Sequence, residues 1–218
     1  MRCMWWKGAV CATAVAMLAL AAGCTSMADV RMAEAKSAML AGDARGATVL
    51  LNQALEEGPT ADAHYYLALI EHQKGTTADS GQAMAHVQQS IRLEPSGRAF
   101  LLRGVLEEGQ DPQAAEASYR LGLDHARDGS ESEALLHRNL GALLARRERW
   151  DEAADQFGAY MKTAETKRLA VSDAERALWG TILFQQGQDE GARTAWNAMQ
   201  DTTWRRRLLA AAAIRSDR

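Results

Sequence analysis

The chain has 218 residues, of which 47% are apolar, 24% charged and 6% aromatic, and its formal net charge is -3. This composition is typical of a globular protein and excludes a wholly disordered chain. The slightly acidic balance and the presence of only three prolines also exclude a strongly basic nucleic-acid binder and a proline-rich or collagen-like chain.

The first 24 residues form a targeting segment rather than part of a folded domain. Residues 1–7 carry Arg2 and Lys7 and no acid, and residues 8–22 follow as 15 residues without charge. A run of this length is a signal-peptide hydrophobic region, too short for the roughly 20 apolar residues that span a bilayer. The run ends on Leu20-Ala21-Ala22-Gly23-Cys24, which resembles the lipobox of bacterial lipoproteins.

The lipobox resemblance implies that residues 1–23 are a lipoprotein signal peptide and that Cys24 is the lipidated first residue of the mature chain. Two or three acyl chains on Cys24, palmitate among them, hold a protein stably at a membrane. No aspartate follows the cysteine directly, and by the same resemblance this favours the bacterial outer membrane, with the protein facing the periplasm. The alternative is an ordinary secreted protein cleaved near Ala22.

Cysteine usage agrees with this interpretation. Cys3 and Cys11 leave with the signal peptide, so the mature chain, residues 24–218, keeps only Cys24. Disulfides, a cysteine zinc site and a cysteine nucleophile are therefore excluded from the folded body.

A repeating pattern of small and large apolar residues covers most of the mature chain. In the clearest units a small residue follows a large apolar one, and an alanine lies four residues before an aromatic residue. The units that show this pattern contain Gly141, Ala153 and Phe157, then Gly180, Ala192 and Trp196. Weaker units contain Ala35, Ala47 and Leu51, then Ala68, Ala83 and Val87, then Gly104, Ala115 and Tyr119.

This pattern resembles the tetratricopeptide repeat (TPR), a helical hairpin with a period of about 34 residues. The five equivalent alanines, from Ala47 to Ala192, are separated by 36, 32, 38 and 39 residues, which predicts turns of different length. The resemblance implies an all-α fold, a right-handed superhelical solenoid of about five hairpins over residues 24–203. The alternative is a generic helical bundle. In a solenoid, the small residue lets two helix backbones approach closely, while the large residue fills the space between units.

The C-terminal end, residues 204–218, is expected to form a basic helix that caps the solenoid. Residues 205–218 contain five arginines and one aspartate, a net charge of +4, whereas residues 24–204 carry 18 basic and 27 acidic side chains, a net charge of -9. A solenoid needs a polar outer face on its last helix to stay soluble. The alternative is a basic surface that contacts anionic lipid or an acidic partner.

The sequence contains none of the motifs that mark an enzyme: no nucleophile elbow, phosphate-binding loop, dinucleotide fingerprint or zinc-protease helix. His64 and His72 lie eight residues apart on one expected helix and have no further metal ligands in register. We therefore expect a non-enzymatic protein without catalytic residues, cofactor, metal site, small-molecule substrate or nucleic-acid partner. A hydrolase with an unfamiliar site is the alternative.

The TPR resemblance places function on the concave surface that the first helix of each hairpin lines, where extended peptides or partner helices bind. Counting within each unit predicts a groove lined by Tyr65, His72, Phe100, Arg138, Arg146 and Phe184, with Leu69, Glu107, Ala142, Ala177 and Gln185 beside them. The aromatic rings offer contact area and the arginines offer forked donors to carboxylates. The lysine and asparagine set of the chaperone-tail readers in this family is missing, so their role does not carry over.

A lipobox followed by five or six repeats resembles the layout of the pilotin-type lipoproteins that serve type IV pili and secretins. This resemblance implies a membrane-anchored periplasmic scaffold that binds protein partners, such as a secretin or another cell-envelope complex. A second hypothesis keeps the fold and makes the protein an adaptor for cell-wall enzymes or for the machinery that inserts outer-membrane proteins.

Overall fold

The computed structural model describes residues 26–75 and 77–216, and in these residues it contains eleven α-helices and no strand. The helices are α2 (Met27–Leu40), α3 (Ala44–Glu57), α4 (Ala61–Lys74), α5 (Thr77–Leu93), α6 (Gly97–Glu107), α7 (Pro112–Asp124), α8 (Glu131–Arg146), α9 (Trp150–Lys167), α10 (Asp173–Gln185), α11 (Asp189–Asn197) and α12 (Thr202–Ser216). The expected signal peptide and the lipidation site Cys24 lie outside the described residues.

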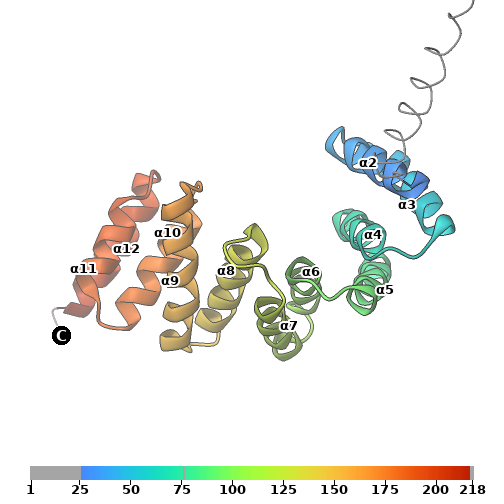
Figure 1. The fold of residues 1–218 in the computed structure, drawn as a ribbon. Helices are drawn as coiled ribbons and strands as arrows, with labels where there is room; N and C mark the ends of the chain where they lie inside the picture. The colour runs from blue at the N-terminus through green and yellow to red at the C-terminus, as the bar shows by residue number, and fades with distance from the viewer. Residues whose placement is uncertain (1–25, 76, 217–218) are drawn as a thin grey trace, which may run out of the picture.

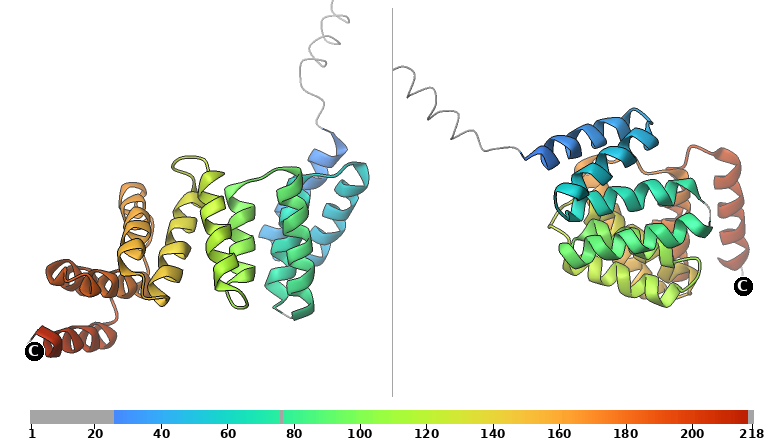
Figure 2. Two further views of the ribbon diagram at one scale, coloured as in Figure 1. Left: turned by 90° about the horizontal axis from the view of Figure 1, so that it is seen from below. Right: turned by 90° about the vertical axis from the view of Figure 1, so that its right-hand side faces the viewer.

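Successive helices pack in five pairs: α2 with α3, α4 with α5, α6 with α7, α8 with α9, and α10 with α11. The pairs follow one another along an open arc, and each contacts mainly its neighbours (Figure 1). Two further views show α12 at the end of this row, away from α2 (Figure 2). The all-α solenoid of helical hairpins that the sequence predicts is therefore confirmed.

The five alanines taken as equivalent mark the second helix of each hairpin, and all five are fully buried. Ala47, Ala115, Ala153 and Ala192 are each the fourth residue of their helix, whereas Ala83 is the seventh residue of α5. The helix α5 thus has three more residues before its alanine than the other second helices have. These added residues lengthen the start of a helix rather than a turn.

Three glycines of the first helices lie against an aromatic residue of the second helix of the same hairpin. A Cβ added at Gly104 would lie 2.3 Å from the Tyr119 ring, and one at Gly180 would lie 2.3 Å from the Trp196 ring. At Gly141 it would meet the backbone nitrogen of Phe157 at 2.7 Å. The structure confirms that these glycines permit the close approach of two helices.

The start of α7 shows how the sequence sets a helix boundary. The Asp111 carboxylate accepts hydrogen bonds from the backbone N–H groups of Gln113 and Ala114, both at 3.0 Å. Pro112 is the first helical residue, where its missing N–H costs no hydrogen bond. Together these two residues start α7 and turn the chain from α6 into α7.

The last helix, α12, begins at Thr202, two residues before the predicted boundary, because Asp201 caps it. The Asp201 carboxylate accepts from the backbone N–H groups of Thr203 and Trp204, both at 2.9 Å. Ala212 is buried, and Leu208 and Leu209 pack against the cluster that α10 and α11 form. The apolar side of α12 thus covers the last hairpin. Among the described residues, no helix is long and apolar enough to cross a membrane.

Candidate partner-binding groove

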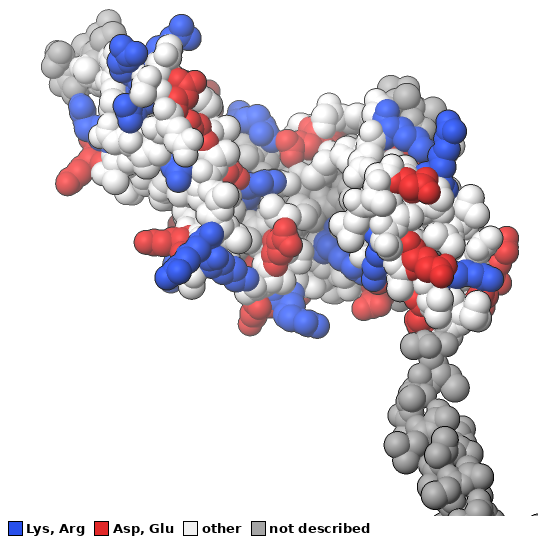
Figure 3. Space-filling view, turned by 90° about the horizontal axis from the view of Figure 1, so that it is seen from above, with Lys and Arg blue, Asp and Glu red and all other residues white. Residues whose placement is uncertain are grey.

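The first helices of the hairpins form one continuous inner face, which we call the groove face. It consists of α2, α4, α6, α8 and α10, and in Figure 1 α4 and α6 lie on the inner side of the arc while α5 and α7 lie outside. Seen from above, basic and acidic side chains share this side of the molecule, which is hollowed between its two ends (Figure 3). A solenoid presents extended binding surfaces of this kind.

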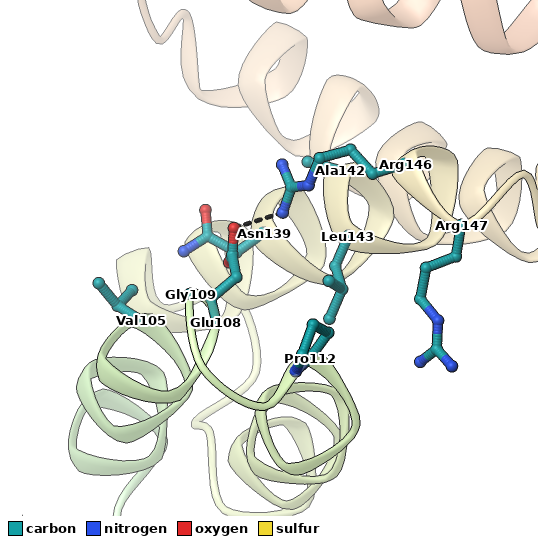
Figure 4. Close-up of a pocket in the computed structure, with 9 residues that line it drawn as sticks. All are labelled: Val105, Glu108, Gly109, Pro112, Asn139, Ala142, Leu143, Arg146 and Arg147. Carbon is teal, nitrogen blue, oxygen red and sulfur yellow. Dashed lines mark hydrogen bonds and ion pairs between the residues drawn. The ribbon is translucent and has the colours of Figure 1, made fainter.

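A cavity of about 610 Å³ lies on the groove face between α6 and α8. Apolar groups form much of its wall, while charged and amide groups stand at its edge (Figure 4). It is lined by Val105, Glu108, Gly109, Pro112, Asn139, Ala142, Leu143, Arg146 and Arg147. An apolar wall with a few polar groups is the usual composition of a site that binds a side chain or small ligand.

Arg146 stands at the edge of this cavity and forms an ion pair with Glu108, the residue that caps the end of α6 (Figure 4). The other oxygen of Glu108 accepts a hydrogen bond from the hydroxyl of Tyr119 at 2.7 Å. Burial and the adjacent Glu108 carboxylate raise the pKa of Tyr119, so the hydroxyl keeps its proton and remains a donor. Glu108 is therefore held from the protein side by Tyr119, and it orients Arg146 on the groove side.

Arg138, two turns earlier on α8, is held in a similar way by Glu175 of α10. Its Nη1 lies 3.3 Å from Oε1 of Glu175, which also accepts from the Tyr160 hydroxyl at 2.8 Å. Oε2 of Glu175 accepts from the backbone N–H and the hydroxyl of Ser172, both at 2.7 Å. Burial alone would raise the pKa of Glu175, but the Ser172 and Tyr160 hydrogen bonds and Arg138 keep it below its usual value. The carboxylate is thus charged and fully engaged.

The N-terminal part of the groove face contains an aromatic and basic cluster. The guanidinium of Arg98 in α6 lies 4.6 Å from the centre of the Tyr65 ring and pairs with Asp62 of α4. Lys36 of α2 lies 3.8 Å from the same Asp62 and 5.2 Å from the centre of the Tyr66 ring. Ion pairs on the groove face therefore connect each hairpin to the next, from α2 through to α10.

The structure places five of the six predicted groove residues on first helices with partly or largely exposed side chains. Arg138 and Arg146 flank Ala142 on α8, and Tyr65 stacks with Arg98. His72 is half-buried near the end of α4, and the half-buried Phe184 ring lies 5.8 Å from that of Trp196. These residues are spread along the array, and among them only Arg146 lines the cavity between α6 and α8, while Arg138 lies two turns earlier on α8 and pairs with Glu175 of α10.

The prediction for α6 was wrong by one position. Phe100 is only 5% exposed and its ring stacks on His125 at 5.3 Å, while Glu107 turns toward α7 and accepts from the Ser118 hydroxyl. Phe100 lies four residues before Gly104, whereas Tyr65 and Arg138 lie three residues before the small residues of their units, so the prediction was out of register by one residue. Counting from Gly104 with the offset that gives His72 from Ala68 leads to Glu108, which does line the cavity.

Sequence reasoning missed the acidic partners on the groove face, Asp62, Glu108 and Glu175. Glu108 lies four residues after Gly104, the offset that gives His72 from Ala68, so its place could have been found from the sequence. Sequence reasoning also missed a pair of histidines, His64 and His86, whose Nδ1 atoms lie 3.1 Å apart between α4 and α5. These two are 22 residues apart and only the packing of the hairpin brings them together. In the part of the chain that is described, no group of three or more histidine, cysteine, aspartate or glutamate residues is placed to hold a metal ion.

Comparison with solved structures identifies the fold. PilF of Pseudomonas aeruginosa superimposes with a TM-score of 0.64 and 18% identity, over 78% of this chain and 74% of that chain. YrrB, described as a TPR protein with an unusual peptide-binding site, gives 0.60 and 17% identity over 83% and 89%. MamA gives 0.58 and 17% over 78% and 88%. No family model and no curated sequence matches the chain. The likeness shows a TPR fold.

Proposed function

We propose that this protein is a membrane-anchored scaffold that binds a segment of a partner protein across its groove face. The observation that carries the proposal is the cavity between α6 and α8, where Val105, Ala142 and Leu143 offer apolar surface beside Arg146, which Glu108 orients. This combination of contact area and directed donors suits a peptide rather than a reaction. The TPR fold and its similarity to YrrB, a protein with a peptide-binding site, support the same role.

The proposed address is the periplasmic side of the bacterial outer membrane, through acyl chains on Cys24. It rests on the lipobox-like run before that cysteine. Ser26, which caps α2 through its side chain, follows Cys24 by two residues, or about 7 Å of extended chain. Lipid on Cys24 would therefore hold the first hairpin close to the membrane surface.

Replacing Cys24 with serine tests the anchor. We expect Cys24→Ser to move the protein from the sedimented membranes to the periplasmic extract, while a Cys11→Ser variant stays with the membranes. Sedimentation of Cys24→Ser with outer membranes would contradict the anchor.

The finer proposal is a role in the assembly of type IV pili or secretins, and it rests on the layout of a lipobox followed by repeats. The rival role is that of an adaptor for cell-wall enzymes or for the outer-membrane protein insertion machinery. Both roles require the same groove, so the identity of the captured partner separates them.

Site-specific photo-crosslinking in intact cells tests the groove and names the partner. A crosslinking residue at position 142, beside the cavity, is compared with one at position 49, since Val49 is 56% exposed on the outer helix α3. We expect a defined product from position 142 and none from position 49. A secretin in that product supports the pilus role, and a cell-wall enzyme or an insertion-machinery component supports the adaptor role. Equal products from both positions, or none from position 142, would contradict the groove.

A further inference from the structure

In both ion pairs that involve α8, the arginine is the outer member and the carboxylate is the inner one. The Arg138 side chain is 37% exposed against 16% for Glu175, and the Arg146 side chain is 54% exposed against 31% for Glu108. At the Arg98–Asp62 pair, in contrast, the two side chains are equally exposed, at 37% and 38%. Around the cavity, an approaching partner therefore meets guanidinium groups before it meets carboxylates.

The inner carboxylates have little capacity left for a partner. Glu175 accepts hydrogen bonds from Ser172, Tyr160 and Arg138, which use both of its oxygens. Glu108 accepts from Tyr119 through one oxygen and from Arg146 through the other. A guanidinium group carries five N–H donors. Its bond to a fixed carboxylate holds it in one orientation, and its remaining donors point away from that carboxylate.

We propose that the segment bound on the groove face is acidic, and that it places one carboxylate on Arg138 and a second on Arg146 with an apolar side chain between them. This inference rests on the proposed function and names the chemistry of its partner. It follows from charge complementarity to the two outer guanidinium groups, since a basic segment would face them and would have to displace them from Glu108 and Glu175.

The spacing of the two arginines fixes the spacing of the carboxylates. Eight residues of helix separate Arg138 from Arg146, which is about 12 Å along the axis of α8. An extended chain rises about 3.3 Å per residue and its side chains alternate in direction. Residues four apart in an extended segment lie on the same side and are separated by about 13 Å. The matching pattern is an acidic residue, an apolar residue two positions later and a second acidic residue two positions after that.

The middle position of that pattern falls at Ala142, which lies four residues from each arginine. The short Ala142 side chain leaves space above α8, and the cavity lined by Val105, Ala142 and Leu143 opens beside it. A cavity of about 610 Å³ accommodates a leucine or phenylalanine side chain. Burial of that side chain supplies affinity, while the two charge-assisted contacts set direction and register.

Binding of short fluorescent peptides to the full-length processed protein, purified from membranes in mild detergent, tests the inference. The first peptide carries Asp-Ser-Leu-Ser-Asp between neutral flanks; the second has lysines for the aspartates, and the third has the aspartates two apart. We expect the first to bind at least about tenfold more tightly than either of the others, since each of the others loses at least one charge-assisted contact to an arginine. Equal or tighter binding of the lysine peptide would overturn the inference.

Variants locate the binding site. We expect Arg138→Gln and Arg146→Gln each to weaken the first peptide about tenfold and to reduce its preference over the lysine peptide. Arg120→Gln is the matched control, because Arg120 also forms an ion pair between two hairpins, with Glu152, but on second helices. Unchanged circular dichroism spectra establish that each variant is folded.

The two proposals fail in distinguishable ways. If position 142 crosslinks a partner but Arg138→Gln and Arg146→Gln bind the acidic peptide as tightly as the unchanged protein, the acidic-segment inference is wrong and the groove stands. If position 142 gives no crosslink and none of the three peptides binds, both proposals are wrong. Both proposals are supported if the crosslinked partner segment carries two carboxylates four residues apart and if a variant with Arg138→Gln and Arg146→Gln together no longer captures it.

Discussion

The two ends of the solenoid fill the same space in different ways. In the three C-terminal hairpins a glycine of the first helix lies against an aromatic residue: Gly104 and Gly180 receive a ring, and Gly141 receives the backbone and Cβ of Phe157. In the two N-terminal hairpins an alanine faces an aliphatic residue, with Ala35 and Leu51 in one and Ala68 and Val87 in the other, all at most 2% exposed. The large residue of the second helix, which we call the knob, and the small residue that receives it thus change together. The interior must stay close-packed when either of them changes.

Polar contacts between helices differ in the same direction. Glu116 of α7 accepts from Arg147 and Arg149, at 2.8 Å and 2.7 Å, and from Arg120, so it joins the third hairpin to the fourth. The N-terminal part also has ion pairs, those of Lys36 and Arg98 with Asp62, but its second hairpin adds a close contact between His64 and His86. These two bases tolerate at most one shared proton, so this contact responds to pH in the opposite sense to an ion pair.

Truncation of the aromatic knob should give the largest effect. Phe157→Ala deletes a fully buried ring and is expected to lower the free energy of unfolding by about 3–5 kcal/mol. Val87→Ala, the corresponding change in an N-terminal hairpin, removes about two methylene equivalents and should cost about 2 kcal/mol. Urea unfolding followed by circular dichroism measures both. An equal loss for the two variants would show that the aromatic hairpins are not the more tightly packed part.

Enlarging the receiving residue tests the same contact from the other side. Gly141→Leu places side-chain atoms where the Phe157 backbone already lies, and overpacking of this kind costs about 1–3 kcal/mol. Gly81→Leu is the control, because a Cβ at this exposed position of α5 meets nothing within 4 Å and leucine favours helix more than glycine. We expect a lower melting temperature for the first variant only. An unchanged value for Gly141→Leu would refute the close approach of α8 and α9.

Glu116→Gln should have a smaller effect, of about 1 kcal/mol, because the network is partly exposed. Burial alone would raise the pKa of Glu116, but hydrogen bonds from Arg120 and Arg149 keep it below its usual value. A carboxyl with a lowered pKa in the folded state contributes stability above the unfolded pKa, near 4.5, and that stability disappears as pH falls through the folded value. Thermal unfolding between pH 7 and pH 3 should show a smaller fall in melting temperature for Glu116→Gln than for an exposed-site control, Glu165→Gln.

Replacing one member of the histidine pair should give the smallest effect on stability. This effect should occur at higher pH than that of Glu116→Gln. Burial lowers the pKa of His64, helped by His86, and burial also lowers that of His86 against the opposing charge of Glu71. The unfolded chain then binds more protons near pH 6.5, so stability is complete above that pH and falls as the solution is acidified toward pH 5. His64→Gln should flatten this dependence and His72→Gln should not. A profile that is identical in all three proteins would show that the pair does not affect folding.

The hairpins could be predicted because the same pattern of small and large packing residues recurs five times in the sequence. A single alanine says little, but Ala47, Ala115 and Ala153 recur with a glycine or alanine twelve or eleven residues earlier, and all three are buried. The groove was predicted less well, since an offset of four residues before Gly104 leads to the buried Phe100, whereas the offset of three that holds in other units leads to Leu101. A shift of one position rotates a helical residue by about 100°, enough to exchange the surface for the core.

The sequence by itself determined the helices, the hairpins and the residues that lock each hairpin, because these depend on contacts that recur at fixed spacing along the chain. It also marked Arg138 and Arg146 as groove residues. Only the tertiary structure decided that their carboxylate partners, Glu175 and Glu108, come from the hairpins on either side and lie beneath them. Which member of an ion pair faces outward depends on how neighbouring hairpins stack, and no single repeat contains that information.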